Sequence, residues 1–397
     1  MKNLLIIKFG KALKTIKKEG LYRGGKRVFA SFFALFRQVG SGDILIVTGG
    51  IGDSARYRAD HHAEELKING FKVSTTVQDN PFLYKYHRKF KVFIFHRVLY
   101  TPSVKRLIKS ARGKNKEIIF ETDDLVFDKK YLKYMDYFQN MNALERKLYE
   151  NGVGGEILDD PYVNVCTTTT SFLAEKLRNK GKKVFIVTNK LSKKDLGWAD
   201  GVRIKKKDSF VRLGYFSGTI SHNKDFATIT DALLVVLKNH AHALLYLVGP
   251  LEVEERLLAG NENRIIMIPF VNRRKYFEIL SVADINLAPL ETENPFCEAK
   301  SELKFFEPGI LGIPTVAVRN RTFSEAIEDG FNGFLAHNTV EWIEKITELI
   351  QNQKTRKEMG IRARQTALEK YTTVNASHDE YYLYLKNSIN PGQVKKL

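Results

Sequence analysis

Short apolar segments of strand length alternate with amphipathic segments of helical periodicity along most of this chain. Such alternation predicts βαβ units, in which a parallel sheet carries helices on both of its faces. One series begins at Asp43, and a second begins at Val211. We therefore expect an α/β protein with two tandem, doubly wound Rossmann-like domains. The predicted strands are Ile44–Thr48, Phe71–Thr76, Val92–His96, Ile118–Thr122, Val163–Cys166 and Val184–Val187 in the first series, and Val211–Ser217, Ala243–Val248, Ile265–Pro269, Ile285–Ala288 and Thr315–Val318 in the second.

The length of 397 residues suits two domains, each with a core of its own. The segment Leu191–Asp208 is rich in lysine and aspartate and only weakly periodic, so we interpret it as the linker. The tyrosine-rich stretch Asp379–Lys386 predicts a helix that returns to the first domain. The predicted parts are a basic amphipathic segment (1–40), a first domain (41–208), a second domain (209–370) and a returning C-terminal helix (371–397).

The composition is strongly basic, with 64 Lys and Arg against 45 Asp and Glu and a formal charge of +19. Such a balance predicts an anionic partner: nucleic acid, a membrane surface or a phosphorylated ligand. Cys166 and Cys297 are far apart and match no metal-site spacing, so we expect no disulfide framework. The apolar run Leu4–Ile7 is too short for a signal peptide and stops at Lys8, and no run reaches the length of a membrane span. We expect a cytoplasmic protein.

The first forty residues carry much of the positive charge, with Glu19 as the only acidic residue up to Arg37. Lysines occupy one side of a predicted helix, and a stripe of aromatic residues follows. Basic amphipathic segments of this kind bind anionic membrane surfaces, and no nucleic-acid-binding module is recognisable. In the alternative interpretation the aromatic stripe packs on the protein's own core. The stripe consists of Phe29, Phe32, Phe33 and Phe36.

The stretch FCEAKSELKFFEPGILGIPTVA, residues 296–317, is the most informative about chemistry. It predicts a helix over Lys300–Leu311, closed by Gly312 and followed by a buried strand. On such a helix Lys300, Lys304 and Glu307 share one face. A helix N-terminus with a nearby lysine can bind phosphate, and a carboxylate one turn on can accept hydrogen bonds from a ribose diol. The alternative is an amphipathic helix with a solvated charged face.

In doubly wound sheets, ligands bind at the carboxyl ends of strands. The loop GGIGDSARYR after the first strand contains Gly49, Gly50 and Gly52, which allow a ligand to approach the backbone. A tight strand–helix turn is the alternative. Arg56 and Arg58 either contact phosphate or are simply solvated.

Two further strand ends in the first domain carry polar residues. His96 ends one strand, where it is either a site residue or a structural histidine. Glu121, Asp123 and Asp124 end the next, and crowded carboxylates raise one another's pKa and suit base chemistry or sugar binding. They could also ligate a metal, although no matching His or Asp cluster accompanies them. In the alternative interpretation Asp123 or Asp124 is a helix N-cap.

The segment FSGTISHNKDF follows the first strand of the second domain. Gly218 and Thr219 are small residues beside a potential phosphate, and Lys224 lies near the start of the next helix. Asp225 also fits an N-cap, so part of the segment is structural.

These motifs resemble the GT-B-fold glycosyltransferases, and the second domain is most similar to the family 4 (group 1) enzymes of bacterial polysaccharide synthesis. That group has an E-x7-E pattern that ends in a helix like LEAMACGxPVVA, and KFFEPGILGIPTVA matches its second half. Glu307 is then the second glutamate, whereas Glu298 lies nine positions earlier instead of eight. Lys224 matches the lysine of the family's Arg-x4-Lys pair, but Thr219 occupies the arginine position. Lys304 could supply the missing charge.

The resemblance implies a retaining, metal-independent sugar transferase that works in an interdomain cleft, without a cofactor and with a nucleotide-sugar as donor substrate. The donor would contact Glu307, Lys304, Lys224, Gly218, Thr219 and Gly50. The catalytic candidates are His96, Asp123, Asp124 and Glu298, and the acceptor would lie near Arg56, His96 and Asp123.

The implied setting is the assembly of a capsule, lipopolysaccharide or other surface glycan, with rhamnosyl transfer as one option. The acceptor would be a glycan on a lipid carrier, and the protein would lie peripherally at the inner face of the cell membrane. UDP, GDP and dTDP sugars remain open as donors, and the oligomeric state, a homo-oligomer included, is also open. Two other classes share the fold: a nucleotide-sugar epimerase and a non-catalytic partner of a true transferase.

Overall fold

The computed structural model describes residues 39–135, 149–202, 208–218, 223–375 and 377–391, with single positions between 24 and 36 and between 138 and 146. The chain forms two compact units. The first extends to Asn189 and resumes at His378, and the second spans Lys190–Ser377. Most of the predicted N-terminal helix and the predicted site residue Thr219 lie outside the described residues.

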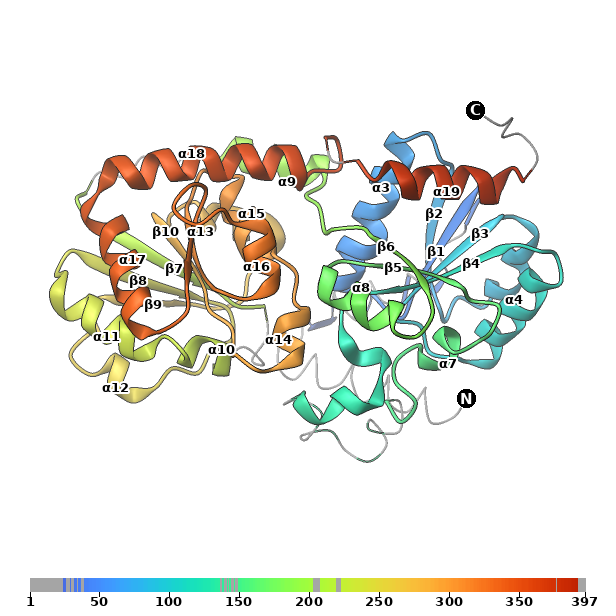
Figure 1. Cartoon of the computed structure of the whole chain (residues 1–397), viewed down its shortest axis with the longest axis horizontal. Helices are drawn as coiled ribbons and strands as arrows, with labels where there is room; N and C mark the ends of the chain where they lie inside the picture. Colours follow the sequence, from blue (N-terminus) through green and yellow to red (C-terminus); the bar gives the residue numbers. More distant parts are fainter. Residues whose placement is uncertain are drawn as a thin grey trace. The chain divides into compact units, whose positions relative to one another are not determined.

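The first unit contains a six-stranded sheet in the order β2-β1-β3-β4-β5-β6, and every neighbouring pair is parallel (Figure 1). Long apolar runs form these strands because both faces of a parallel sheet are covered. The register places Thr48, His96 and Glu121 side by side. The strands are β1 (Ile44–Thr48), β2 (Val73–Val77), β3 (Val92–His96), β4 (Glu117–Thr122), β5 (Val165–Thr168) and β6 (Lys183–Ile186).

Helical segments connect these strands. Helix α4 begins where Thr101 accepts a hydrogen bond from Val104 N and Pro102 takes the first position, as expected for an N-cap followed by proline. The loop after β1 leads into a continuous helical stretch with a six-residue π-helix in its middle. The helices are α2 (Asp53–Ala55), the π-helix η1 (Arg56–His61), α3 (His62–Ile68), α4 (Pro102–Arg112), α7 (Gly155–Leu158) and α8 (Ser171–Arg178), with 3₁₀ turns at Leu83–Arg88, Leu125–Phe127 and Lys129–Tyr134.

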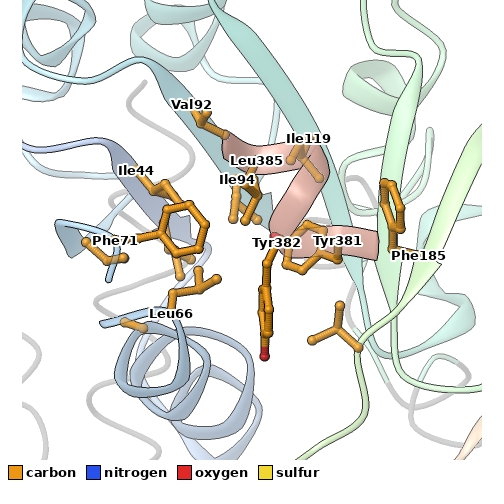
Figure 2. Packing of buried hydrophobic residues seen from close by; sticks show 14 of the residues in the cluster. Ile44, Leu66, Phe71, Val92, Ile94, Ile119, Phe185, Tyr381, Tyr382 and Leu385 are labelled. Carbon is orange, nitrogen blue, oxygen red and sulfur yellow. The ribbon is translucent and has the colours of Figure 1, made fainter. Parts of the chain in front are cut away.

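The last helix, α19 (Asp379–Ile389), packs on the sheet of the first unit (Figure 2). Tyr381, Tyr382 and Leu385 join a buried cluster that includes Ile94 from β3. The Tyr382 hydroxyl donates a hydrogen bond to Glu65 of α3. Burial of each large side chain contributes roughly 1.5–3 kcal/mol, so this helix is an integral part of the first unit although it follows the second in sequence.

The second unit contains another six-stranded parallel sheet, in the order β12-β11-β10-β7-β8-β9. With two such sheets and helices between their strands, the prediction of an α/β, GT-B-type architecture is confirmed. The strands are β7 (Val211–Phe216), β8 (Ala243–Val248), β9 (Ile265–Ile268), β10 (Ile285–Ala288), β11 (Thr315–Val318) and β12 (Phe334–Ala336). The helices are α9 (Lys193–Gly201), α10 (Asn223–Ala227), α11 (Thr230–Asn239), α12 (Glu255–Leu258), α13 (Arg273–Leu280), α14 (Pro295–Ala299), α15 (Leu303–Gly309), α16 (Arg321–Ala326), α17 (Thr339–Gln351) and α18 (Gln353–Lys370).

The predicted linker is wrong in its N-terminal half. Residues from Lys190 onward belong to the second unit, so the division precedes the predicted boundary at residue 208. Helix α9 forms because Ser192 and Asp195 make a reciprocal capping box, and Asp195 also pairs with Arg273. The helix is polar and depends on these contacts, which explains its weak periodicity.

The helix predicted over Lys300–Leu311 is present, but it begins three residues later than predicted. Asn294 caps α14 and Pro295 begins it, whereas Lys300 has extended backbone angles and α15 begins only at Leu303. Lys300 and Lys304 therefore do not share a helix face. Gly312 follows α15 with a φ of 73°, which is the left-handed conformation expected of a glycine at a helix end.

Candidate functional site

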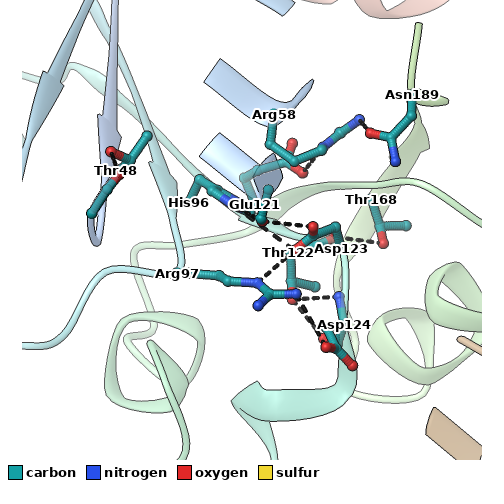
Figure 3. Close-up of polar contacts among 12 residues, drawn as sticks. Thr48, Arg58, His96, Arg97, Glu121, Thr122, Asp123, Asp124, Thr168 and Asn189 are labelled. Carbon is teal, nitrogen blue, oxygen red and sulfur yellow. Dashed lines mark hydrogen bonds and ion pairs between the residues drawn. The ribbon is translucent and has the colours of Figure 1, made fainter. Parts of the chain in front are cut away.

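Three predicted loops of the first unit converge because β1, β3 and β4 are adjacent parallel strands. Their carboxyl ends carry the glycine loop with Ser54, then His96 and Arg97, and finally Asp123 and Asp124. Figure 3 shows His96, Arg97, Asp123 and Asp124 in one polar cluster. The expectation that strand ends would bring these residues together holds for the first unit.

Asp123 is the centre of this cluster. Arg97 Nε donates to Asp123 Oδ1 at 2.6 Å, and Arg97 Nη2 donates to Asp124 Oδ2 at 3.1 Å. Ser54 Oγ donates to Asp123 Oδ2 at 2.7 Å and lies 2.8 Å from His96 Nε2. Burial alone would raise the pKa of Asp123, but the Arg97 guanidinium, the Ser54 hydrogen bond and the Arg58 guanidinium together outweigh burial and hold that pKa well below its usual range. Asp123 therefore remains an ionised acceptor.

The state of His96 follows from the same contacts. Because ionised Asp123 can only accept hydrogen bonds, the Ser54 hydroxyl donates its one hydrogen to Asp123. The contact between Ser54 Oγ and His96 Nε2 then requires Nε2 to be the donor. Burial lowers the pKa of His96 to about 3. The imidazole is therefore neutral near pH 7, and it orients Ser54 without titrating in that range.

The expectation that crowded carboxylates raise one another's pKa is wrong for Asp123, because an arginine that the sequence analysis did not single out lies between the two aspartates. For Asp124 the capping alternative is confirmed. Its carboxylate accepts from Leu125 N at 2.7 Å and caps the 3₁₀ turn Leu125–Phe127. Asp124 thus has a structural contact as well as its ion pair.

The sequence predicted that Arg58 either contacts phosphate or is solvated, and both alternatives are wrong. Its side chain is 1% exposed, and Nε donates to Glu121 Oε1 at 2.7 Å. Arg58 Nη1 also donates to Val187 O at 2.7 Å and Asn189 Oδ1 at 3.2 Å. Arg56 instead pairs with Asp53 at 2.6 Å. The π-helix turns Arg58 inward, and helical periodicity alone could not have indicated this.

A pocket of about 300 Å³ lies beside this cluster. Its lining combines apolar side chains and Tyr149 with Ser54, His96 and Arg97. Gly49 is required by packing, since a Cβ there would lie 2.0 Å from the Arg97 carbonyl oxygen, whereas a Cβ at Gly50 would meet open space. A cavity with an aromatic side, a guanidinium donor, a hydroxyl oxygen and an ionised carboxylate nearby suits one small polyhydroxylated group.

A second cluster lies in the other unit, around Asp225 at the start of α10. Lys300 Nζ donates to Asp225 Oδ2 at 2.6 Å. Asp225 Oδ1 accepts from Glu291 N at 3.1 Å and from Cys297 Sγ at 3.2 Å. Asp225, Glu291 and Cys297 could geometrically surround a cation, but burial raises the pKa of Cys297 to about 12 and the Lys300 ammonium already neutralises Asp225. This chemistry does not favour a metal.

Lys304 distinguishes this cluster. Its ammonium nitrogen is buried 4.1 Å from the centre of the Tyr215 ring, and it has no hydrogen-bond partner among the described residues. Burial lowers the pKa of Lys304 from 10.5 to about 7. Lys300 takes the ion pair with Asp225, and a buried ammonium without a hydrogen-bond partner, such as that of Lys304, is costly. An anion such as phosphate would complete the site.

Glu307 lies in α15 and is 7% exposed. Both of its oxygens accept hydrogen bonds from α13: Arg273 Nη1 donates to Oε1 at 2.5 Å, and the Tyr276 hydroxyl donates to Oε2 at 2.6 Å. Arg273 Nε also donates to Asp195 Oδ1 at 3.1 Å. The sequence analysis did not single out Arg273 or Tyr276, because nothing in their local pattern distinguishes them from neighbouring helix residues.

Three further predicted site residues of the second unit are Gly218 and Lys224, expected to bind the donor, and the catalytic candidate Glu298. Gly218 is exposed just after β7, and Lys224 is exposed in α10. Glu298 is partly buried in α14, where its carbonyl accepts from the Thr322 hydroxyl at 3.3 Å. The place of Glu298 in the site remains a prediction.

Residues 203–366 match the family model described as glycosyl transferases group 1. The matched region covers most of the second unit, so the similarity to this family lies in that unit. This match confirms the resemblance drawn from KFFEPGILGIPTVA. No curated protein sequence matches the chain significantly.

Solved structures extend the similarity of fold to both units. HepE of Anabaena, solved with UDP-glucose, is 13% identical with a TM-score of 0.56, and the alignment covers 88% of this chain and 100% of HepE. Sucrose-phosphate synthase of Thermosynechococcus elongatus is 13% identical with a TM-score of 0.57, covering 87% of this chain and 97% of the synthase. TarM of S. aureus is 17% identical with a TM-score of 0.53, covering 78% of this chain but only 57% of TarM. The chain thus spans less than two thirds of TarM, and identities this low show the fold alone.

Proposed function

We propose that this protein is a glycosyltransferase that moves a sugar from a nucleotide-sugar donor to a glycan acceptor. The observation that carries the proposal is the buried Lys304 ammonium, which has no hydrogen-bond partner among the described residues and lies in the region that matches the group 1 glycosyl transferases. A diphosphate would supply the missing negative charge. HepE, of the same fold, was solved with UDP-glucose, which supports a UDP-sugar as the first donor to test.

In this proposal the donor lies on the second unit. Lys304 and Lys224, with the backbone at Gly218, hold the diphosphate and stabilise its charge as it leaves. Glu307 accepts hydrogen bonds from the ribose hydroxyls. These cations take the place that a metal ion has in other transferases, so we propose metal-independent transfer.

The acceptor lies in the pocket of the first unit, where Ser54, Arg97 and ionised Asp123 orient its hydroxyl groups. The bond between the anomeric carbon and the phosphate oxygen breaks, and a bond from that carbon to the acceptor oxygen forms. For the retaining outcome implied by the family resemblance, the acceptor proton passes to the departing phosphate.

The N-terminal aromatic stripe supports a membrane-bound acceptor. Phe29, Phe32, Phe33 and Phe36 are each more than half exposed, between 52% and 63%. The surrounding sequence is strongly basic, as an anionic bilayer requires. Among the described residues, no helix combines the length and apolarity needed to cross a bilayer. We propose peripheral attachment and a lipid-linked glycan acceptor in surface polysaccharide synthesis.

Co-sedimentation with anionic phosphatidylglycerol vesicles tests the attachment. Replacing all four phenylalanines of the stripe by serine should abolish binding, whereas the matched change Phe82→Ser at another exposed phenylalanine should not. Equal binding of both variants would contradict the proposed role of the stripe.

The central experiment measures thermal shifts with UDP, GDP, dTDP, CMP and ADP sugars. A donor at a hundred times its Kd should stabilise the protein by about 2.7 kcal/mol. One nucleotide class should raise the Tm, and the Lys304→Met and Glu307→Ala variants should lose that response. No response to any nucleotide sugar would overturn the proposal.

A further inference from the structure

Arg273 occupies an unusual position at the start of α13. Its guanidinium is 12% exposed and lies between two carboxylates that come from different helices, Asp195 of α9 and Glu307 of α15. The stacked ring of Phe277 lies 4.8 Å from the guanidinium carbon. The two carboxylates and the Phe277 ring therefore fix the orientation of the guanidinium plane.

The Asp195 end of this bridge is itself fixed. Asp195 Oδ2 accepts from Ser192 N at 3.3 Å, and Asp195 N donates to Ser192 Oγ at 3.2 Å. Asp195 is thus anchored to the first turn of α9. Arg273 can transmit this fixed geometry to Glu307, because a planar guanidinium with its donors in a rigid fork constrains both carboxylates.

Tyr276 fixes the other oxygen of Glu307. Its hydroxyl donates at 2.6 Å, and its ring makes an edge contact with Phe216 at 5.7 Å between centroids. Phe216 is the last residue of β7, so this contact ties the carboxylate to the carboxyl end of a central strand. A glutamate side chain has three torsions, and these contacts hold it in one arrangement.

We propose that Arg273 and Tyr276 are positioning residues that set the plane of the Glu307 carboxylate for two ribose hydroxyls. The inference rests on the proposed function, because it assumes that Glu307 contacts the ribose. Arg273 and Tyr276 hold opposite oxygens of the Glu307 carboxylate, and a carboxylate oxygen can accept more than one hydrogen bond. With the plane fixed in this way, the two oxygens would meet the adjacent 2′ and 3′ hydroxyls in set directions.

The test compares the binding of UDP with that of 2′-deoxy-UDP by calorimetry, with GDP and 2′-deoxy-GDP as the second pair. The wild-type protein should prefer the ribonucleotide by about tenfold, because the deoxy analogue leaves one acceptor without its donor. Arg273→Gln should reduce that preference to less than about threefold. The matched control is Arg274→Gln, since Arg274 is 73% exposed on the same helix and should retain the full preference.

Tyr276→Phe provides a second variant that keeps the ring and loses only the hydroxyl. Tyr276→Phe should also reduce the preference for the ribonucleotide. Arg273→Lys keeps the positive charge but not the forked guanidinium, so its preference should lie between those of Arg273→Gln and the wild-type protein. When either change is added to Glu307→Gln, it should have no further effect on the preference. This non-additivity separates positioning from a general loss of structure.

The possible failures are distinguishable. If the wild-type protein binds neither UDP nor GDP, the proposed function fails. If it binds and discriminates but Glu307→Gln keeps the preference, the ribose site lies elsewhere. If Glu307→Gln loses the preference while Arg273→Gln and Tyr276→Phe keep it, the positioning inference alone is overturned.

Discussion

The two units present similar parallel sheets, but the polar clusters near their strand ends differ in charge pairing. In the first unit each carboxylate has a cation in hydrogen-bond range: Glu121 has Arg58, and Asp123 and Asp124 share Arg97. In the second unit Lys300 pairs with Asp225, but the buried Lys304 ammonium contacts the Tyr215 ring and has no hydrogen-bond partner among the described residues.

This difference in charge pairing indicates which kind of ligand each cluster suits. In the first cluster each carboxylate is already paired with a cation, so its charges are balanced and suit a neutral, hydroxyl-rich acceptor. The second carries a stability cost that an anionic ligand would relieve. Binding sites often retain such strain because the ligand compensates for it. The predictions below test this contrast.

The largest effect is expected from Arg58→Met. It leaves Glu121 buried without its cation, which typically costs about 3–5 kcal/mol of unfolding free energy. Both tryptophans, Trp198 and Trp342, belong to the second unit, so tryptophan fluorescence should follow that unit while circular dichroism follows both. We expect an early transition by circular dichroism that fluorescence does not detect.

The double variant Arg58→Met/Glu121→Leu is the control for that prediction. It removes both charges and should recover much of the lost stability. If the single variant unfolds at the wild-type denaturant concentration by both methods, the first cluster does not depend on this ion pair.

Lys304→Met and Lys300→Met should change stability in opposite directions. Removing the unpartnered Lys304 ammonium should stabilise the second unit by about 2 kcal/mol and weaken UDP binding by about tenfold to a hundredfold. Removing Lys300 should destabilise the unit, because Asp225 loses its cation. Tryptophan fluorescence in urea gives both values. If Lys304→Met destabilises the second unit, the Lys304 ammonium contributes to stability, and the proposed difference between the two clusters is wrong.

The pH dependence of UDP binding follows from Lys304, whose pKa is about 7 in the free protein. A bound diphosphate favours the protonated ammonium and raises its pKa, so binding takes up a proton above pH 7. Affinity should fall between pH 7 and 9, by at most about tenfold per pH unit. Stability without ligand should change in the opposite sense, because between pH 7 and 10.5 the unfolded state holds more protons and Lys304 makes stability rise with pH.

Calorimetry of UDP binding and urea unfolding across this pH range check both slopes. Lys304→Met is the control and should flatten each of them. An affinity that stays constant from pH 7 to 9 in the wild-type protein would show that Lys304 does not contact the diphosphate.

The smallest effect is expected from Ser54→Ala. It removes the hydroxyl between His96 and Asp123, at a cost of about 0.5–1.5 kcal/mol. Because Ser54 lines the pocket of the first unit, the acceptor KM should rise while the Kd for UDP stays unchanged. A change in UDP affinity without a change in acceptor KM would reverse the roles assigned to the two units.

Much of the fold could be predicted because its strongest signals are local. The strands Ile44–Thr48, Val92–His96, Ala243–Val248 and Ile285–Ala288 have the predicted bounds, since a buried parallel strand is a continuous apolar run. Helix α9 was missed because its stability depends on a capping box and on Arg273, which lies far along the chain. The split between α14 and α15 was missed because Lys300 contacts Asp225 instead of continuing a helix.

The sequence by itself determined the two sheets and the positions of the polar residues at strand ends, because both follow from local hydrophobic patterns and from the rule that parallel strands end at one edge. Only the tertiary structure decided which of these residues are paired. Ser54 and Asp123, Arg58 and Glu121, and Arg273 and Glu307 come from separate elements of the chain. The charge state of a buried group depends on such distant partners and on burial, so the ionised Asp123, the neutral His96 and the lowered pKa of Lys304 could not be predicted from local sequence.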